Sequence, residues 1–210
     1  MSNDSQHQDF PGSRWWQFDF HTHTPASTDY KGDQSITPED WLLNFMRVGI
    51  DCVAVTDHNS GAWIDELKQA LGSDRFKQHA DYRALTLFPG IELSVNNGVH
   101  LLAIFDPSKG TEDIDKLIGA VGYHGTPGDS NAVTEDSLQQ CIEKALKAGA
   151  IPIPAHVDYP KGLLNVVTDH HTLESVLAKL AAVEVTNTDS ETFLQHGEKI
   201  AGLSQVKGSD

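Results

Sequence analysis

The stretch FDFHTHTPASTDY, residues 18–30, places two histidines at the end of a short apolar run. His21 and His23 are separated by a single residue, and a carboxylate, Asp29, follows in a polar segment. Side chains two residues apart on a strand point to the same face, so the two imidazoles can reach one ion together. The stretch therefore predicts the end of a strand that carries a metal site.

The whole chain has the size and composition of one globular domain. It contains 210 residues, and its 30 acidic residues outnumber its 15 basic ones, which gives a formal charge of −15. Such a charge disfavours a general nucleic-acid-binding surface, although bound cations can reverse the local field at a metal site. We expect residues 1–13 to be a disordered lead and residues 14–210 to form the domain.

Two further patterns bear on the compartment. The polar N-terminus has no apolar core of a secretory signal, and no apolar run reaches the roughly 18 residues that a membrane helix needs. The two cysteines, Cys52 and Cys141, fall in apolar stretches and suit buried reduced thiols. These patterns predict a cytoplasmic protein without a membrane partner.

Strand-like and helix-like patterns alternate along the chain. Strands are predicted at 15–21, 50–58, 85–95, 99–105, 150–157 and 182–187. Helices are predicted at 36–49, 61–72, 111–120, 134–150, 171–181 and 189–203. Alternation of this kind favours an α/β domain with a parallel sheet or barrel.

The helix at 36–49 has the clearest boundaries. Thr37 suits the N-cap, Pro38 suits the first helical position, and Gly49 suits the C-terminal end. The apolar residues at helical spacing form the predicted buried face, which consists of Trp41, Leu42, Phe45 and Val48.

Several of the predicted strands end in residue types that bind metals. His58 ends the second strand, Glu92 the third and His156 the fifth, while His100 begins the fourth. The carboxyl ends of strands in a parallel barrel converge on one mouth, where active sites are built. Together with the first stretch, these side chains exceed the about four ligands that one zinc ion uses. We therefore expect two or three divalent ions of zinc, manganese or iron, a cluster suited to activating water and clamping a phosphoryl group.

Three other residues have candidate roles beside the metals. His124, in the glycine-containing loop at 122–132, is a candidate general acid for the leaving group. Lys161, in the segment after the fifth strand, is a candidate cation for holding phosphate. Both positions also suit solvated loop residues, so that alternative stays open. Asp57 is expected to orient a neighbouring ligand rather than to bind metal itself.

The segments that carry these residues occur in a fixed order: DFHTHTPAS (19–27), AVTDHN (54–59), PGIELSV (89–95), VHLLAIF (99–105) and IPAHVD (153–158). This ordered set resembles the motifs of the PHP family, the polymerase and histidinol phosphatase domains, over most of the chain. The resemblance implies a distorted (β/α)7 barrel, a trinuclear metal site and phosphoesterase activity. It also implies the metal ligands His21, His23, Asp29, His58, Glu92, His100 and His156.

A narrower resemblance concerns the sequence segments around the motifs. The segments SRWWQFDFHTHTPAS (13–27), VTDHNSGAW (55–63) and AVGYHGTPGDS (120–130) resemble PHP domains at the front of larger AAA-like or SMC-like ATPases. This likeness implies a C-terminal ATPase domain in a longer protein as a partner.

One departure from the family pattern lies at the C-terminal end. Family members carry a final Asp-x-His motif; Asp210 matches its aspartate, and the histidine has no counterpart in this sequence. We expect Asp210 to be an eighth ligand and the TIM-like barrel to lack its last strand–helix unit. An open barrel edge would favour pairing with another copy of the chain, a homo-oligomer.

These features together predict a metal-dependent hydrolase that acts on phosphoric ester bonds. The substrate would be a phosphorylated small molecule, as a mono- or diester, or a nucleic acid. Two alternatives remain: a nuclease head governed by an ATPase, which uses the same metal chemistry in a more open groove, and a catalytically weak PHP-like binding domain.

Overall fold

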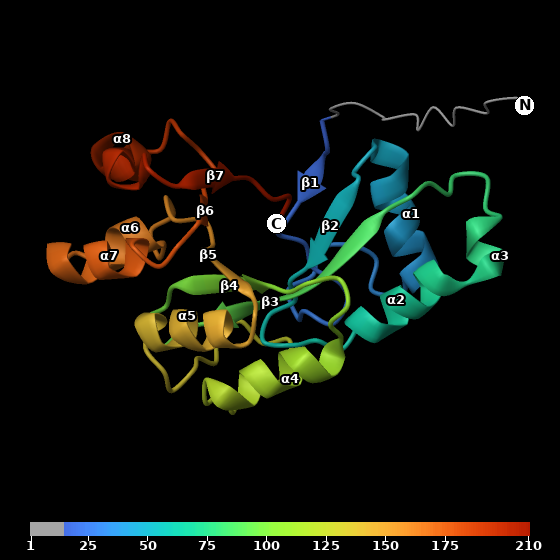
Figure 1. Cartoon of the computed structure of the whole chain (residues 1–210), viewed down its shortest axis with the longest axis horizontal. Helices are drawn as coiled ribbons and strands as arrows, with labels where there is room; N and C mark the ends of the chain where they lie inside the picture. The colour runs from blue at the N-terminus through green and yellow to red at the C-terminus, as the bar shows by residue number, and fades with distance from the viewer. Residues whose placement is uncertain (1–14) are drawn as a thin grey trace, which may run out of the picture.

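The computed structural model describes residues 15–210 and shows a curled sheet with helices on its outside (Figure 1). The predicted lead at 1–13 lies outside the described residues. Five strands form one sheet in the order β1-β2-β3-β4-β5, and β6 pairs with β7 in a second. The strands are β1 (Phe18–Asp19), β2 (Cys52–Val55), β3 (Thr86–Ser94), β4 (His100–Ile104), β5 (Ile151–Pro154), β6 (Ala182–Glu184) and β7 (Ser204–Val206). The predicted α/β class is confirmed.

Most predicted helices are present at the expected places, and two short ones, α3 and α6, add to them. The helices are α1 (Pro38–Val48), α2 (Ile64–Gly72), α3 (Asp74–Lys77), α4 (Thr111–Ala120), α5 (Leu138–Lys147), α6 (Leu163–Val166), α7 (His170–Leu177) and α8 (Glu191–His196), followed by a 3-10 turn, η1 (Gly197–Ile200). Within residues 15–210, no helix combines the length and the apolar character needed to cross a bilayer. Both cysteines are buried and neither forms a disulfide, as predicted.

The expectation of parallel strands throughout is wrong for β4. Strands β1, β2 and β3 are parallel, whereas β4 runs antiparallel to both β3 and β5. The turn between β3 and β4 is too short for a parallel crossover, which takes about a dozen residues or more. It closes with the Val95 N–H donating to Val99 O (2.9 Å), and Gly98 adopts a φ of +84°. As a result, the first residue of β4, His100, lies beside the last residue of β3.

The C-terminal region also differs from the expectation. The predicted final helix at 189–203 is shorter, because α8 and η1 end by Ile200 and β7 follows. The barrel was expected to lack its last strand. The structure instead has one strand more than the sequence predicted, β7, and this strand pairs in parallel with β6. No helix follows β7 in the described residues. The end of the chain returns to β1, since the Asp210 N–H donates to His21 O (3.1 Å).

Helix α1 begins and ends as its sequence predicts. Thr37 accepts a hydrogen bond from a backbone N–H of the first turn, Pro38 follows, and Gly49 ends the helix with a φ of +88°. The buried face differs from the prediction, because Val48 is 70% exposed and Phe45 is only half-buried. The buried residues are Trp41, Leu42, Leu43 and Met46. Phe45 is thus free to line a cavity.

Asp158 ties the end of β5 to the end of β6. Its buried carboxylate accepts hydrogen bonds from the N–H groups of Thr186 and Asn187, both at 2.9 Å, and from the Thr186 hydroxyl. Burial alone would raise the pKa of Asp158, but these donors outweigh it and lower the pKa below its ordinary value. The carboxylate therefore stabilises the fold where it is ionised.

We predict that Asp158→Asn lowers the free energy of unfolding by about 1.5–3 kcal/mol at neutral pH, because an amide NH2 would face a backbone N–H. The folded-state pKa lies below the unfolded one, so the difference from wild type should be lost as the pH falls below about 4. Urea unfolding at neutral pH and below about pH 4 measures the free energy of unfolding of both proteins. Asp115→Asn, at an exposed position of α4, is the control; equal losses in the two variants would contradict the assignment.

Candidate metal centre

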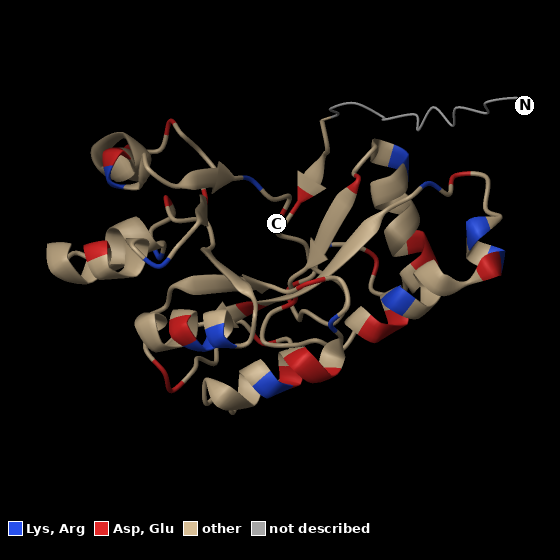
Figure 2. Cartoon of the chain, viewed as in Figure 1, with Lys and Arg blue, Asp and Glu red and all other residues tan. Residues whose placement is uncertain are grey.

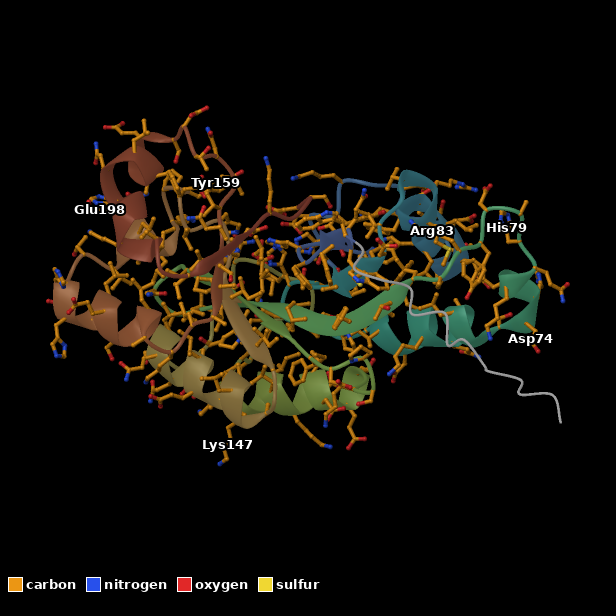
Figure 3. All side chains as sticks on the ribbon, turned by 45° about the horizontal axis from the view of Figure 1, so that its top comes forward. Asp74, His79, Arg83, Lys147, Tyr159 and Glu198 are labelled. Carbon is orange, nitrogen blue, oxygen red and sulfur yellow. The ribbon has the colours of Figure 1, made fainter. Side chains whose placement is uncertain are left out.

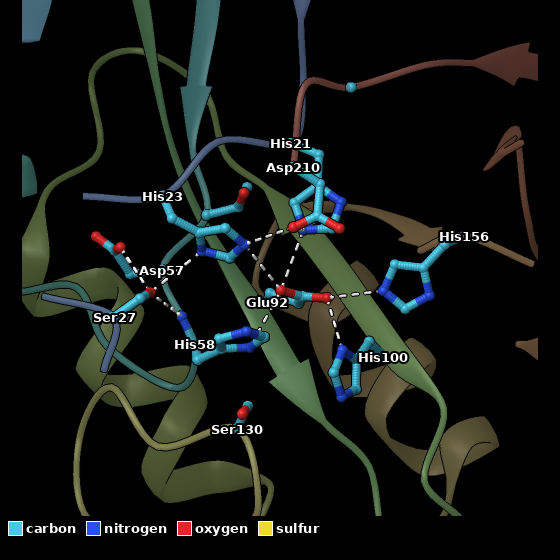
Figure 4. Close-up of polar contacts among 12 residues, drawn as sticks. His21, His23, Ser27, Asp57, His58, Glu92, His100, Ser130, His156 and Asp210 are labelled. Carbon is cyan, nitrogen blue, oxygen red and sulfur yellow. Dashed lines mark hydrogen bonds and ion pairs between the residues drawn. The ribbon is translucent and has the colours of Figure 1, made fainter. Parts of the chain in front are cut away.

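Three imidazoles converge on one oxygen of a buried carboxylate, Glu92, at the C-terminal part of β3 (Figure 4). Glu92 Oε2 lies 3.1 Å from His21 Nε2, 3.4 Å from His23 Nε2 and 3.1 Å from His58 Nδ1. The side chain of Glu92 is 1% exposed. Residues far apart in sequence thus meet in one buried position.

The other oxygen of Glu92 faces two more imidazoles. Glu92 Oε1 lies 2.8 Å from His100 Nδ1 and 3.3 Å from His156 Nε2. His100 reaches this point because β4 runs antiparallel, which brings its first residue to the end of β3. His156 follows β5 directly, and its backbone has a φ of +32°, an unusual value for a residue with a side chain.

Two carboxylates lie at the exposed rim of this group. Asp29 Oδ2 lies 3.2 Å from His58 Nε2, and its side chain is 52% exposed. Asp210 Oδ1 lies 3.3 Å from His23 Nε2, and its side chain is 33% exposed. The structure therefore brings together all of the residues predicted as metal ligands. We call them the metal cluster: His21, His23, Asp29, His58, Glu92, His100, His156 and Asp210.

The segment after β1 is held straight by its neighbour β2. The Thr22 N–H donates to Thr56 Oγ1 (3.0 Å), and the Thr22 hydroxyl donates to Ala54 O (2.6 Å). Thr22 thus points toward β2, while His21 and His23, one residue to either side, point into the site with ring centroids 5.1 Å apart. This is the arrangement that the His-x-His spacing of residues 21–23 predicts for an extended chain.

Glu184, the last residue of β6, fixes the orientation of His21. Its Oε2 accepts a hydrogen bond from His21 Nδ1 at 2.8 Å, so in the neutral ring the nitrogen without a proton is Nε2, which faces Glu92 Oε2. Two lone pairs 3.1 Å apart repel each other unless a cation or a proton lies between them. The same carboxylate of Glu184 also accepts the His156 N–H (2.9 Å). The donor set therefore fits a bound cation.

His23 is oriented in the same way through a hydroxyl. The Ser27 hydroxyl donates to Asp57 Oδ1 (2.8 Å), so it accepts from His23 Nδ1 (3.1 Å) and from the His58 N–H (3.0 Å). His23 Nε2 is then the free lone pair that faces Glu92. Asp57, which is buried, thus orients a cluster residue through Ser27, in line with the role expected for it.

Unpartnered polar atoms collect at the centre of the cluster. Among the residues described, the buried atoms without a hydrogen-bond partner include His21 Nε2, His23 Nε2, His58 Nδ1, Glu92 Oε2 and His156 Nδ1. Each such atom costs about 1–3 kcal/mol when left unpaired. Two sets of residues, His21–His23–Glu92 and His58–Glu92–His100, each offer three candidate ligand atoms, and the three atoms within a set all lie within 4.8 Å of one another. Both sets share Glu92.

The carboxylates give this site a field that attracts positive charge. Burial disfavours the protonated form of His21, but Glu92 and Glu184 outweigh it and raise the pKa of His21 well above its ordinary value. Burial likewise opposes the ionised form of Glu92, yet the surrounding imidazoles hold its pKa well below the usual range. Contact with His23 lowers the pKa of Asp210 to about 2.

The two candidate catalytic residues lie in exposed segments. His124, on the loop between α4 and α5, has its Nε2 3.5 Å from Glu135 Oε1, and its side chain is 76% exposed. Lys161 is exposed between β5 and α6. Neither has a described contact with the metal cluster, and their roles stay predictions.

Two residues near the site were not anticipated from the sequence. Glu184 is the last residue of the observed strand β6, but the predicted strand ran on to residue 187, so the sequence did not mark Glu184 as a strand-end residue. Lys31 follows Asp29 closely in the chain and lines a cavity beside the metal cluster. The only feature of the sequence that pointed to Lys31 was that it lies close after the two histidines, His21 and His23.

No protein-family model matches the sequence, and no curated protein does so significantly. Solved structures resemble the fold. A candidate metal-dependent phosphoesterase from Bifidobacterium adolescentis has a TM-score of 0.59 at 18% identity, covering 93% of this chain and 87% of that one. A two-domain protein from Bacteroides vulgatus containing a predicted PHP-like metal-dependent phosphoesterase has a TM-score of 0.53 at 17% identity, covering 93% and 51%.

An endonuclease has a higher structural similarity. The lesion-specific endonuclease Q from Pyrococcus furiosus has a TM-score of 0.66 at 15% identity, covering 93% of this chain. This chain spans only 48% of that endonuclease. At these identities the likeness establishes the fold, a mixed α/β half-barrel of the kind found in PHP-like phosphoesterases.

We predict that Glu184→Gln weakens metal binding about 10- to 100-fold, because the variant loses the charge that orients His21 and places an amide NH2 among backbone donors. Competition with a chromogenic chelator measures the affinity, and circular dichroism checks the fold. The matched control is Glu198→Gln, an exposed residue at the α8 side of the molecule (Figure 3). Wild-type affinity in the Glu184 variant would show that this carboxylate does not support the cluster.

Proposed function

We propose that the protein is a metal-dependent hydrolase of phosphoric esters that uses two or three divalent ions of zinc, manganese or iron. The observation that carries the proposal is the convergence of five imidazoles on the buried carboxylate of Glu92, with unpartnered atoms facing one another. Nitrogen and carboxylate donors of this kind suit these metals.

Some residues of the site would bind the ions, and others lie where the substrate would enter. The imidazoles and Glu92 would hold the ions, while Glu184 and Ser27 keep His21 and His23 in the required orientation. When bound, the ions would lower the pKa of water and stabilise charge on the phosphoryl oxygens. Asp29 and Asp210 lie on the exposed rim, so the substrate would enter from their side.

A cation and a proton donor would complete the reaction. Lys31 lines the cavity beside the cluster, whereas Lys161 is exposed in the segment that leads to α6. His124 belongs to a loop that touches the site, because the Gly128 N–H donates to His58 O (2.9 Å). This contact supports His124 as the residue that would protonate the leaving oxygen.

A nuclease is the second candidate. It is favoured by the likeness to an endonuclease Q in complex with a 27-mer duplex that has an abasic lesion at the active site, with a TM-score of 0.67 over 91% of this chain. It is opposed by the formal charge of −15 and by the mixture of acidic and basic residues along the outer helices α2, α4 and α5 (Figure 2). We therefore rank a small phosphate ester first.

The partner proposals rest on sequence and on sheet edges. An ATPase domain in a longer protein is supported only by the sequence segments that surround the motifs. Self-association is supported by the separation of the two sheets, because β1 and β7 are edge strands of different sheets in the described residues. Light scattering with and without metal tests self-association.

The function is tested by metal analysis together with a panel of substrates. Protein purified without chelator should contain more than one metal per chain. It should hydrolyse an aryl phosphate, a bis-aryl phosphate or a single-stranded oligonucleotide when manganese or zinc is supplied. Less than one metal per chain and no hydrolysis under any of these conditions would favour the catalytically weak binding domain instead.

We predict that His21→Ala lowers the metal content and removes turnover while keeping the fold, because the His21 ring contacts Glu92 and Glu184 of the site and strand-end residues of this kind serve chemistry more than packing. The loss of activity should exceed the roughly 10- to 100-fold loss seen when only a hydrogen-bond partner of a ligand is removed. Elemental analysis and the substrate panel measure both effects. His171→Ala, at an exposed position of α7, should match wild type; metal content that is equal in both variants would remove His21 from the cluster.

We predict that Lys31→Met raises KM about fivefold, as expected for an exposed charged contact of roughly 1 kcal/mol, and that Lys161→Met leaves KM nearly unchanged. The reason is that Lys31 lines the cavity that joins the cluster. Steady-state kinetics with the best substrate of the panel distinguishes the two lysines. The reverse order would return the phosphate-binding role to Lys161.

A further inference from the structure

A cavity of 320 Å³ adjoins the metal cluster on the side of α1. Three cluster residues are among those that line it, namely His23, Asp29 and Asp210. Its size is near the lower end of the roughly 300–1,000 Å³ typical of small-ligand sites. The cavity is therefore continuous with the proposed reaction centre and suited to one small organic group.

One wall of the cavity is aromatic and firmly held. The rings of Trp41 and Phe45, one helical turn apart on α1, have centroids 4.5 Å apart and planes tilted by 51°. The Trp41 indole N–H donates to His23 O (3.0 Å), which ties this wall to the cluster. Trp41 is buried, and the half-buried Phe45 packs beside it. The wall is thus formed before any ligand arrives.

A third aromatic side chain, Tyr30, also lines the cavity. The Tyr30 N–H donates to Ser27 O (3.2 Å), which connects its backbone to the network that orients His23. Its ring lies against Gly32, where an added Cβ would be 2.3 Å from the Tyr30 hydroxyl oxygen. A glycine is therefore needed at position 32 for the ring to occupy this place. Lys31 and Asn44 add polar groups to the lining.

We propose that this cavity receives an aromatic ring in the organic part of the substrate, and that the substrate is a phosphomonoester of an alcohol that carries an aromatic or heteroaromatic ring, a class that includes nucleotides. Flat side chains such as those of Tyr30 and Phe45 pair favourably with a flat ring. The phosphate would lie at the cluster, where His23, Asp29 and Asp210 meet the cavity. This proposal rests on the proposed function of the same site.

The reaction itself is ordinary hydrolysis and needs no further reactant. Water adds its oxygen to phosphorus and the ester P–O bond breaks. The leaving oxygen takes up one proton, which the attacking water supplies in the overall balance, so the products are inorganic phosphate and an alcohol. The cavity contributes by binding the organic group on the leaving side, which makes Tyr30 and Phe45 specificity residues rather than catalytic ones.

The test compares two substrates whose leaving alcohols have similar acidity but differ in aromaticity: benzyl phosphate and cyclohexylmethyl phosphate. With the metal-loaded full chain, we expect kcat/KM to be about three- to tenfold higher for benzyl phosphate. The corresponding non-hydrolysable phosphonates should show the same order of affinity by calorimetry. Equal kcat/KM and equal affinity for the two compounds would overturn the proposal.

Substitutions then place the preference in this cavity. Phe45→Leu and Tyr30→Leu keep apolar volume but remove the rings, and each should reduce the benzyl preference toward unity. Val48→Ala, on the same helix but exposed, should keep it. Phe45→Leu also guards against the loss of folding that an alanine at this half-buried position could cause. A preference retained in both leucine variants would contradict the assignment of the cavity.

The outcomes separate this proposal from the proposed function. If neither ester is hydrolysed but benzylphosphonate binds more tightly than its saturated partner and Phe45→Leu removes the difference, the cavity proposal stands and the phosphoesterase proposal fails. If both esters are hydrolysed equally well, the phosphoesterase stands and the cavity proposal fails. Hydrolysis of an oligonucleotide in preference to both esters would overturn the cavity proposal in favour of the nuclease.

Discussion

The buried carboxylate of Glu92 is the constraint on which the site depends. A carboxylate that is 1% exposed is costly to keep ionised unless positive charge or hydrogen-bond donors surround it. Here five imidazoles face its two oxygens, and several of the facing atoms have no hydrogen-bond partner. Protonated imidazole can supply the missing charge in the metal-free protein, and cations can supply it in the loaded one. The fold therefore holds a buried carboxylate at a point where a cation or a proton between the facing atoms is stabilised.

The architecture serves this centre by bringing strand ends together. Parallel strands β1, β2 and β3 deliver His21, His58 and Glu92 to one edge of the sheet. The antiparallel β4 contributes the beginning of a strand instead of an end, which places His100 at the same edge. Strand β6 adds no ligand of its own, yet its last residue, Glu184, orients the His21 imidazole and accepts the backbone N–H of His156. The departure from a regular barrel thus adds a group to the site.

Much of the site could be predicted from the sequence because the signals were local. The His-x-His spacing of residues 21–23 predicts two imidazoles on one face of a strand. Histidines or acidic residues at several strand ends predict that these side chains converge at one end of the barrel. The direction of β4 depended on the five residues at 95–99, whose shortness excludes a parallel crossover; strand patterns alone do not record direction. Glu184 lay beyond prediction because its importance comes from a contact across 163 positions of sequence. The exposure of Val48 and the half-burial of Phe45 also depended on tertiary packing, since a helical stripe gives a face but not its exact edges.

The burial of the cluster residues indicates the side from which a substrate would come. The imidazoles of His21 and His58 are almost fully enclosed, whereas Asp29 and Asp210 retain a third to a half of their exposure. Exposed carboxylates at the rim would repel a phosphate unless cations screened them, so substrate binding should depend on prior metal binding. The same rim opens toward α1, whose aromatic residues are tied to the backbone of His23 by the Trp41 indole. Metal binding, phosphate binding and recognition of the organic group would therefore share one short stretch of chain, residues 21–31, which explains why the opening motif carries so much of the site.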